Sequence, residues 1–139
     1  MSGKKKQPDF TRNVLPIVKK MQRARDQWGH FTELWAWLVT DSGWKVETRY
    51  HNSLDDMPED STGDTVASTA ARWDYLEGVI DVNCHKLANA DEEEIEYFVV
   101  HELTHCLLAG MQKAVVGMPE QLLEHTVTNV ARALVKARR

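Results

Sequence analysis

The N-terminal part of the chain repeats apolar residues at the spacing of an amphipathic helix. In residues 11–28, apolar positions recur three or four residues apart with cationic residues between them, as in a helix with one buried face. Pro16 fits best near the start of this helix, where its missing N–H is not needed. Gly29 ends the pattern, and residues 30–40 repeat it. We therefore expect two N-terminal helices.

The period of the pattern then changes to two residues. In residues 44–51, Trp, Val, Thr and Tyr alternate with charged residues and His, which predicts a half-buried strand. Residues 52–65 are acidic and rich in turn-forming residues, so we expect an exposed loop there. Residues 66–75 and 79–83 predict two further strands that form a β-hairpin.

A long helix and a final helix follow the predicted strands. Asn89 or Asp91 can cap the first of them, and this helix runs from about Asp91 to Ala109 with Gly110 as its C-cap. The last helix covers residues 119–137 and opens with a proline. Helices, three strands and two more helices, in that order, predict an α+β fold with a small antiparallel or mixed sheet.

Length and composition favour one domain that has no membrane segment. The chain has 139 residues, of which 42% are hydrophobic and 27% charged, values of an ordinary globular domain. We expect residues 1–9 to be a disordered basic tail and residues 10–139 to form the single domain. No apolar run approaches the roughly 18 residues of a membrane span, and no apolar segment follows the N-terminal lysines to make a secretory signal. These features predict a cytoplasmic protein that does not bind membranes.

Charge and cysteine content exclude further classes. The net charge of −4 and the pI of about 5.8 offer no general basic surface for nucleic acid. Cys84 and Cys106 are too few for a disulfide framework, so we expect reduced thiols. Cys84 and His85 would point to opposite sides of a strand, which argues against a nucleophile–base pair.

The predicted long helix carries the candidate chemistry. His101, Glu102 and His105 form the pattern H-E-x-x-H inside the apolar run "VVHELTHCLLAGM". Histidines four residues apart lie on one helical face and can bind the same ion, and the adjacent glutamate can accept a proton from water on that ion. Burying these polar groups without a partner costs several kcal/mol. The alternative is a pair of core histidines whose hydrogen bonds go to backbone carbonyls.

A catalytic zinc needs a third protein ligand. No aspartate follows Asp91, which leaves Glu120, Glu124 and His125. Glu124 is favoured because it shares a helical face with apolar residues that pack toward the core, and Glu120 lies one turn earlier on much the same stripe. His125 is rotated by about 100° from Glu124. The glutamate that is not a ligand can accept a hydrogen bond from a ligating histidine.

These motifs resemble the gluzincin branch of the zinc metallopeptidases. "VVHELTH" is followed by "LLEHTVTNVARAL", with Glu124 nineteen residues after His105. The resemblance covers about residues 44–135 and extends to small metallopeptidase-like proteins of phages and prophages. It implies a minimal zincin fold in which a three-stranded sheet packs on the HExxH helix and the glutamate-bearing helix. It also implies that His101, His105 and Glu124 bind Zn²⁺ and that Glu102 activates water for attack on a peptide carbonyl.

Other branches of the zincins fit less well, and some expected gluzincin features are missing. A metzincin would have Gly and His where Leu108 and Met111 stand, and the downstream aspartate of an aspzincin is absent. Larger gluzincins have an acidic residue at the position of Thr128 and a Tyr or His that stabilises the oxyanion. The nearest candidates for the latter role are Tyr75, Tyr97 and His85.

The sequence therefore predicts a zinc metallopeptidase that hydrolyses a peptide or protein substrate by Glu102-assisted attack of zinc-bound water. The alternative is a zinc-stabilised module without proteolytic activity, which binds a partner through its tryptophan-rich N-terminal part. Helical spacing cannot place Trp35 and Trp37 on one face, although packing of both in the core from a bent helix is favoured. A structural zinc site has no use for Glu102, so the motif favours the enzyme.

Overall fold

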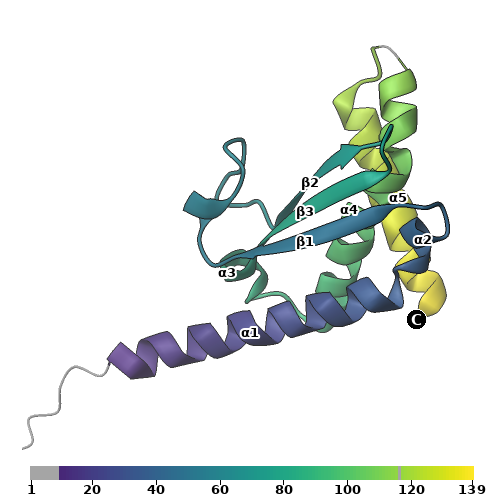
Figure 1. Cartoon of the computed structure of the whole chain (residues 1–139). Coiled ribbons are helices and arrows are strands. Elements are labelled where there is room, and N and C mark those ends of the chain that lie inside the picture. The colour runs from purple at the N-terminus through teal and green to yellow at the C-terminus, as the bar shows by residue number, and fades with distance from the viewer. Residues whose placement is uncertain (1–9, 116) are drawn as a thin grey trace, which may run out of the picture.

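The computed structural model describes residues 10–115 and 117–139, with side chains from residue 16 onward (Figure 1). The predicted tail of residues 1–9 lies outside this range. The elements are α1 (Phe10–Leu34), α2 (Trp37–Thr40), β1 (Lys45–His51), the 3₁₀ turn η1 (Leu54–Asp56), β2 (Ala67–Arg72), β3 (Glu77–Asn83), α3 (Cys84–Leu87), α4 (Glu92–Ala114) and α5 (Glu120–Arg138).

The three strands form one mixed sheet in the order β1-β3-β2. β3 is central, pairs in parallel with β1 and forms an antiparallel hairpin with β2. The predicted α+β class, the mixed sheet and the hairpin are thus confirmed. β2 ends at Arg72, so Trp73 and Tyr75, expected at the end of this strand, lie in the hairpin turn. Because β2 is an edge strand, one side of its backbone is left without a strand partner.

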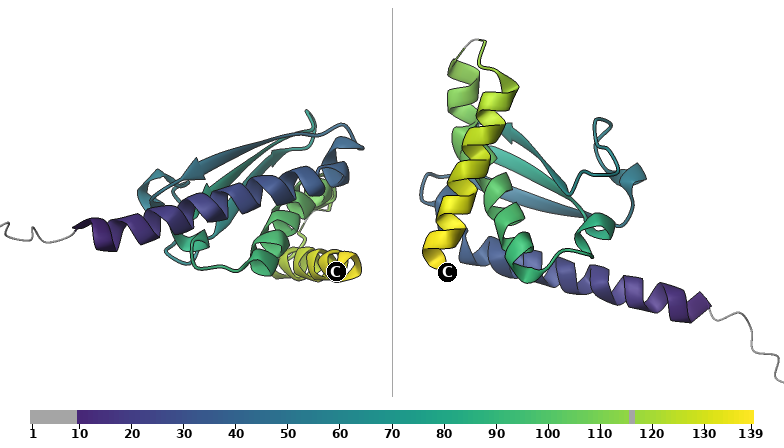
Figure 2. Two further views of the ribbon diagram at one scale, coloured as in Figure 1. Left: turned by 90° about the horizontal axis from the view of Figure 1, so that it is seen from below. Right: turned by 180° about the vertical axis from the view of Figure 1, so that it is seen from behind.

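The helices cover one face of the sheet (Figure 2). α4 is the central helix, because it contacts β2, α1 and α5. Alternate residues of β3 are buried beneath it, and the core between sheet and helices is mainly aliphatic and aromatic. Its largest fully buried apolar side chains are Trp28, Phe31, Ile80, Leu87, Ile95, Leu103, Val82, Val99, Val100 and Val127. No helix in the described residues is long and apolar enough to cross a bilayer.

The N-terminal part forms two helices, as expected, but the boundary predicted at Gly29 was wrong. α1 continues through Gly29 to Leu34, and Pro16 is its seventh residue rather than an early one. Trp28 and Phe31 on either side of Gly29 are fully buried, and their packing outweighs the roughly 1 kcal/mol that glycine costs inside a helix. The residues N-terminal to this packed part extend away from the sheet (Figure 1).

The prediction that both Trp35 and Trp37 pack in the core was also wrong. Trp35 is 4% exposed, whereas Trp37 is 50% exposed. The chain turns at residues 35–36 between α1 and α2, and the two indole rings lie tilted against each other with centroids 5.8 Å apart. Met57 is a similar exception, since it is buried within the otherwise exposed loop at residues 52–65.

The start of α4 follows the prediction and its end does not. Asp91 caps the helix, and its carboxylate and that of Glu94 accept each other's backbone N–H in a capping box. Gly110 does not end the helix, which continues to Ala114. A Cβ atom at Gly110 would lie 3.5 Å from the Trp73 ring, an ordinary van der Waals contact, so the hairpin turn packs next to α4 at this point. α5 begins at Glu120, with Pro119 as its extended N-cap.

Candidate metal centre

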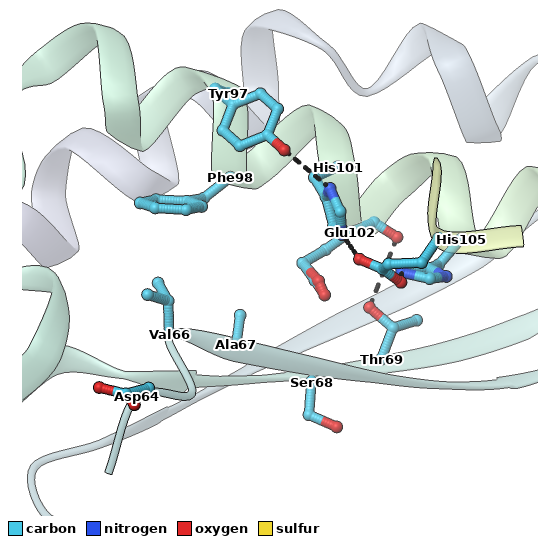
Figure 3. Close-up of a pocket in the computed structure, with 11 residues that line it drawn as sticks. Asp64, Val66, Ala67, Ser68, Thr69, Tyr97, Phe98, His101, Glu102 and His105 are labelled. Carbon is cyan, nitrogen blue, oxygen red and sulfur yellow. Dashed lines mark hydrogen bonds and ion pairs between the residues drawn. The ribbon is translucent and has the colours of Figure 1, made fainter. Parts of the chain in front are cut away.

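His101, Glu102 and His105 lie at the middle of α4 and face the sheet edge and α5 (Figure 3). The two imidazole centroids are 5.0 Å apart. One potential ligand atom from each of the three residues lies within 4.8 Å of the others. The helical spacing therefore gathers the three side chains of the motif into one small volume, as expected for positions i, i+1 and i+4.

Glu124 reaches this cluster from α5. Its Oε1 atom is 2.8 Å from Nε2 of His101, and its Oε2 atom is 3.3 Å from Nε2 of His105. Leu123 and Val127 beside it are buried, so the packing of α5 on α4 holds the carboxylate in place. The Glu124 carboxylate thus contacts the Nε2 atom of each of the two imidazoles.

The other two ligand candidates lie elsewhere on α5. Glu120 is the first residue of the helix, and His125 leaves it about 100° around the axis from Glu124; both are exposed, as is Glu124 itself. In the described part of the chain, neither residue forms an ion pair or hydrogen bond with the two imidazoles. Of the three residues that the sequence left open, only Glu124 lies in contact with the motif.

Nitrogen and carboxylate donors gathered in this way can hold a metal ion. A tetrahedral zinc ion with bonds of 2.0–2.1 Å would have its donors about 3.3 Å apart. The side chains of His101 and His105 are 15% and 22% exposed, so one side of the cluster is open to solvent. His101, His105 and Glu124 would hold the ion, and the open side would supply its fourth position.

The surroundings lower the pKa of both imidazoles. Burial is the main cause in each case, and the Glu124 carboxylate opposes it. For His101, the neighbouring His105 lowers the pKa further. Low pKa values favour neutral imidazoles, the form that binds a metal.

Glu102 has the opposite electrostatic environment. Its side chain is almost completely buried, and burial, followed by the charge of Glu124, raises its pKa to about 8. The hydroxyl of Thr69 on β2 donates to the backbone carbonyl of Glu102 at 3.4 Å, which joins this turn of α4 to the sheet edge. The carboxyl group therefore binds a proton more strongly than an exposed glutamate does, whereas both imidazoles bind one less strongly.

The cluster lines a groove between α4 and β2. A cavity of about 430 Å³ is bordered by Asp64, Val66, Ala67, Ser68, Thr69, Tyr97, Phe98, His101, Glu102, His105 and Glu124 (Figure 3). A second cavity of about 540 Å³ shares Thr69 and His105 with the first and continues to Trp73 and Lys113. The two cavities thus lie next to each other along β2, and His105 borders both of them.

β2 offers its free backbone groups to this groove. The Asn83 N–H donates to the carbonyl of Val66, and the register pairs Ala67 with Val82. In an antiparallel ladder, alternate residues exchange hydrogen bonds, so the N–H and C=O groups of Ala67, Thr69 and Ala71 point away from β3. Among the described residues, this edge of β2 therefore has main-chain donors and acceptors without a strand partner.

The three oxyanion candidates have different positions. Tyr75 is 63% exposed in the hairpin turn, and His85 is exposed on α3; neither borders the groove. Tyr97 borders it, and its hydroxyl is 3.3 Å from Nδ1 of His101. The four-residue spacing between Tyr97 and His101 is a sequence signal that would have indicated this contact. Thr69 gave no such signal, because its neighbour Glu102 is 33 residues away in the chain.

Searches against protein-family models, curated proteins and solved structures found no match to this chain. The functional interpretation therefore depends on the geometry of the site.

Proposed function

We propose that this protein is a zinc-dependent metallopeptidase of the minimal gluzincin type. The observation that carries the proposal is the contact of Glu124 with Nε2 of both His101 and His105, next to the buried carboxyl group of Glu102. His101, His105 and Glu124 supply the three protein ligands that a catalytic zinc needs. Glu102 is not needed as a ligand, and the role of general base explains why a carboxyl group lies beside them.

The residues have distinct roles in the proposed reaction. Zinc, when bound, supplies Lewis-acid polarisation of the scissile carbonyl and lowers the pKa of water. Glu102 accepts the proton of the attacking water and later delivers it to the leaving amine. Burial raises the pKa of this carboxyl group to about 8 in the metal-free protein, and a cation bound next to it would lower that pKa and leave an ionised carboxylate able to accept the proton.

The groove supports a peptide substrate. An extended chain can add to an exposed sheet edge through main-chain hydrogen bonds, and the free groups of Ala67, Thr69 and Ala71 offer that pairing. The edge runs past His105, so a peptide paired with β2 would pass next to the proposed zinc ligands.

The alternative function, a zinc-stabilised binding module, has its own observation. Trp37 and Leu34 are 50% and 41% exposed and border a mainly apolar cavity of about 320 Å³ with Leu134 and Ala137. This surface could bind a partner without hydrolysis. The module does not account for Glu102, a buried carboxyl group beside the two imidazoles that a structural metal site does not need.

The test compares the purified protein with its Glu102→Gln variant. Both are expected to bind about one zinc per chain, measured by elemental analysis after removal of free metal. Only the wild type should cleave peptides from a random-sequence library, and chelation should abolish that cleavage. Equal cleavage by the Glu102→Gln variant would exclude the general-base role, and a wild type that binds no zinc would exclude the enzyme. Zinc binding without cleavage of any library peptide would favour the binding module.

A further inference from the structure

Tyr97 contacts the candidate ligand His101 on the side opposite Glu124. It precedes His101 by one helical turn, so both side chains leave the same face of α4. The Tyr97 hydroxyl is 3.3 Å from Nδ1 of the imidazole, and the two rings pack edge to face with centroids 5.7 Å apart. Nε2 of the same imidazole faces Glu124 at 2.8 Å. Both nitrogens of His101 therefore have a polar neighbour (Figure 3).

We propose that Tyr97 is a positioning residue, which orients the His101 imidazole so that Nε2 faces the metal position. This inference rests on the proposed zinc site. It gives Tyr97 a role different from that of an oxyanion-stabilising residue, because its hydroxyl is engaged by the ligand and not directed at a substrate carbonyl.

A hydroxyl group suits this position because it can both donate and accept a hydrogen bond. A neutral imidazole carries one N–H. Without metal, Nε2–H can donate to Glu124 while Nδ1 accepts from the Tyr97 hydroxyl. A metal at Nε2 requires that nitrogen to be unprotonated, so the proton is then carried by Nδ1 and donated to the Tyr97 oxygen. The imidazole holds one proton in both states, and rotation of the hydroxyl hydrogen completes the change.

The Tyr97 ring is itself held from the side of α5. The Arg132 guanidinium lies 5.3 Å from the ring centroid, within the range of a cation–π contact. Tyr97 also borders a different cavity, which lies between α4 and α5 and is lined by Arg132 as well. His105 has no comparable support, since no hydrogen bond to its Nδ1 occurs among the described residues. Of the two histidine ligands, His101 is thus the one whose orientation depends on Tyr97.

The test removes only the hydroxyl. Tyr97→Phe is compared with the wild type and with Tyr75→Phe, which loses an exposed hydroxyl in the hairpin turn. Zinc affinity is measured by competition with a chromophoric chelator, and the geometry of the site is measured from the visible spectrum of the Co²⁺-loaded protein. We expect Tyr97→Phe to bind zinc about 10- to 100-fold more weakly and to change the cobalt spectrum. Tyr75→Phe should match the wild type in both measurements.

The outcomes separate this inference from the proposed function. A wild type without zinc binding would overturn both. A wild type that binds zinc, together with a Tyr97→Phe variant of equal affinity and identical cobalt spectrum, would overturn the inference alone. A second measurement needs no variant: ¹⁵N NMR of the wild-type imidazoles should show His101 as the Nδ1–H tautomer, bound through Nε2, once zinc is added. Binding through Nδ1 would exclude the role of Tyr97.

Discussion

Two buried glutamates on α4, six residues apart, have opposite electrostatic environments. Glu96 is fully buried and accepts hydrogen bonds from the Trp35 indole and from the guanidinium groups of Arg138 and Arg139. Burial by itself raises the pKa of Glu96, but these hydrogen bonds outweigh it and hold the pKa below its usual range. Glu102 lacks such partners, and its pKa is raised to about 8. Both side chains are buried, so the hydrogen-bond partners of Glu96 are what make its carboxylate stabilise the fold.

Glu96→Gln should therefore destabilise the protein in a pH-dependent way. The variant keeps the size of the side chain but removes the charge that the arginines contact, and we expect a loss of about 1–3 kcal/mol in the free energy of unfolding at pH 7. A lowered folded-state pKa stabilises the fold above the unfolded-state value of about 4.5. The difference between wild type and variant should hence shrink as the pH falls below that value.

Urea denaturation between pH 3 and pH 8 measures this difference. Glu93→Gln is the matched control, because Glu93 lies exposed in the first turn of the same helix. A difference between wild type and Glu96→Gln that stays constant over the whole range would contradict the electrostatic explanation.

The choice between the two glutamates of α5 gives a second prediction at this scale. Glu124→Gln should weaken zinc binding by at least about 10-fold, because a neutral amide replaces a charged ligand, whereas Glu120→Gln should leave zinc affinity unchanged. Chelator competition on both variants measures the two affinities. The reverse ranking would move the third ligand one helical turn earlier.

Sequence patterns predicted single residues where the relevant spacing is local. His101, Glu102 and His105 were placed on one helical face because they lie within about one helical turn of each other. Asp91 was likewise among the expected helix caps. Glu96 could not be singled out, because it stands in a run of similar glutamates and its arginine partners are 42 and 43 residues away. Long-range polar contacts of this kind depend on how α5 packs, which no local pattern contains.

At the scale of elements, glycine was the main source of error. Gly29 and Gly110 were expected to end helices, and both lie inside them. A Cβ atom at either position would make only ordinary contacts, 3.7 Å from the Tyr50 hydroxyl or 3.5 Å from the Trp73 ring. A glycine in a helical pattern is therefore not by itself a helix end, because the packing of the neighbouring residues can carry the helix through it. The strands were predicted more accurately, since the two-residue period is set by the burial of one face of the sheet.

Gly78 on β3 shows how closely the sheet and α4 approach. A Cβ atom at this position would lie 2.9 Å from Sγ of Cys106 and 3.7 Å from the side chain of Val46. Gly78→Ala should lower the free energy of unfolding by about 1–3 kcal/mol, the usual cost of overpacking. Gly63→Ala is the control, since nothing lies within 4 Å of a Cβ there.

A double variant makes this prediction more specific. Removing the sulfur with Cys106→Ala should recover part of the stability lost in Gly78→Ala, so the effects of the two substitutions should be non-additive. Urea denaturation of both single variants and the double variant measures the coupling. Additive effects would show that the close approach of Gly78 and Cys106 does not limit the packing.

At the scale of the whole molecule, polar contacts join α4 and α5 near both ends of α5. Glu124 contacts the two imidazoles near the N-terminal end, and Arg138 and Arg139 contact Glu96 near the other. Between them, α5 buries an apolar stripe, whose members are Leu123, Val127, Ala131 and Val135. The proposed zinc ion would strengthen the first of these contacts, so catalysis and the stability of the helix pair would depend on the same ligands.

Zinc should consequently stabilise the folded protein as a whole. A ligand that binds only the folded state at 100 times its Kd contributes about 2.7 kcal/mol, which corresponds to a rise of about 8 °C in Tm for a domain of this size. Thermal unfolding followed by circular dichroism measures the rise, and chelation should reverse it. Hydrogen exchange should show the added protection at the N-terminal half of α5.

Two controls test whether the rise in Tm comes from the His-His-Glu site. The Glu124→Gln variant should lose most of the rise because its zinc affinity falls. Mg²⁺ should have no effect on the wild type, since a site with two imidazoles suits zinc and not a hard cation that prefers oxygen ligands. An equal rise with Mg²⁺ would contradict a His-His-Glu site, because it would require oxygen ligands elsewhere in the molecule.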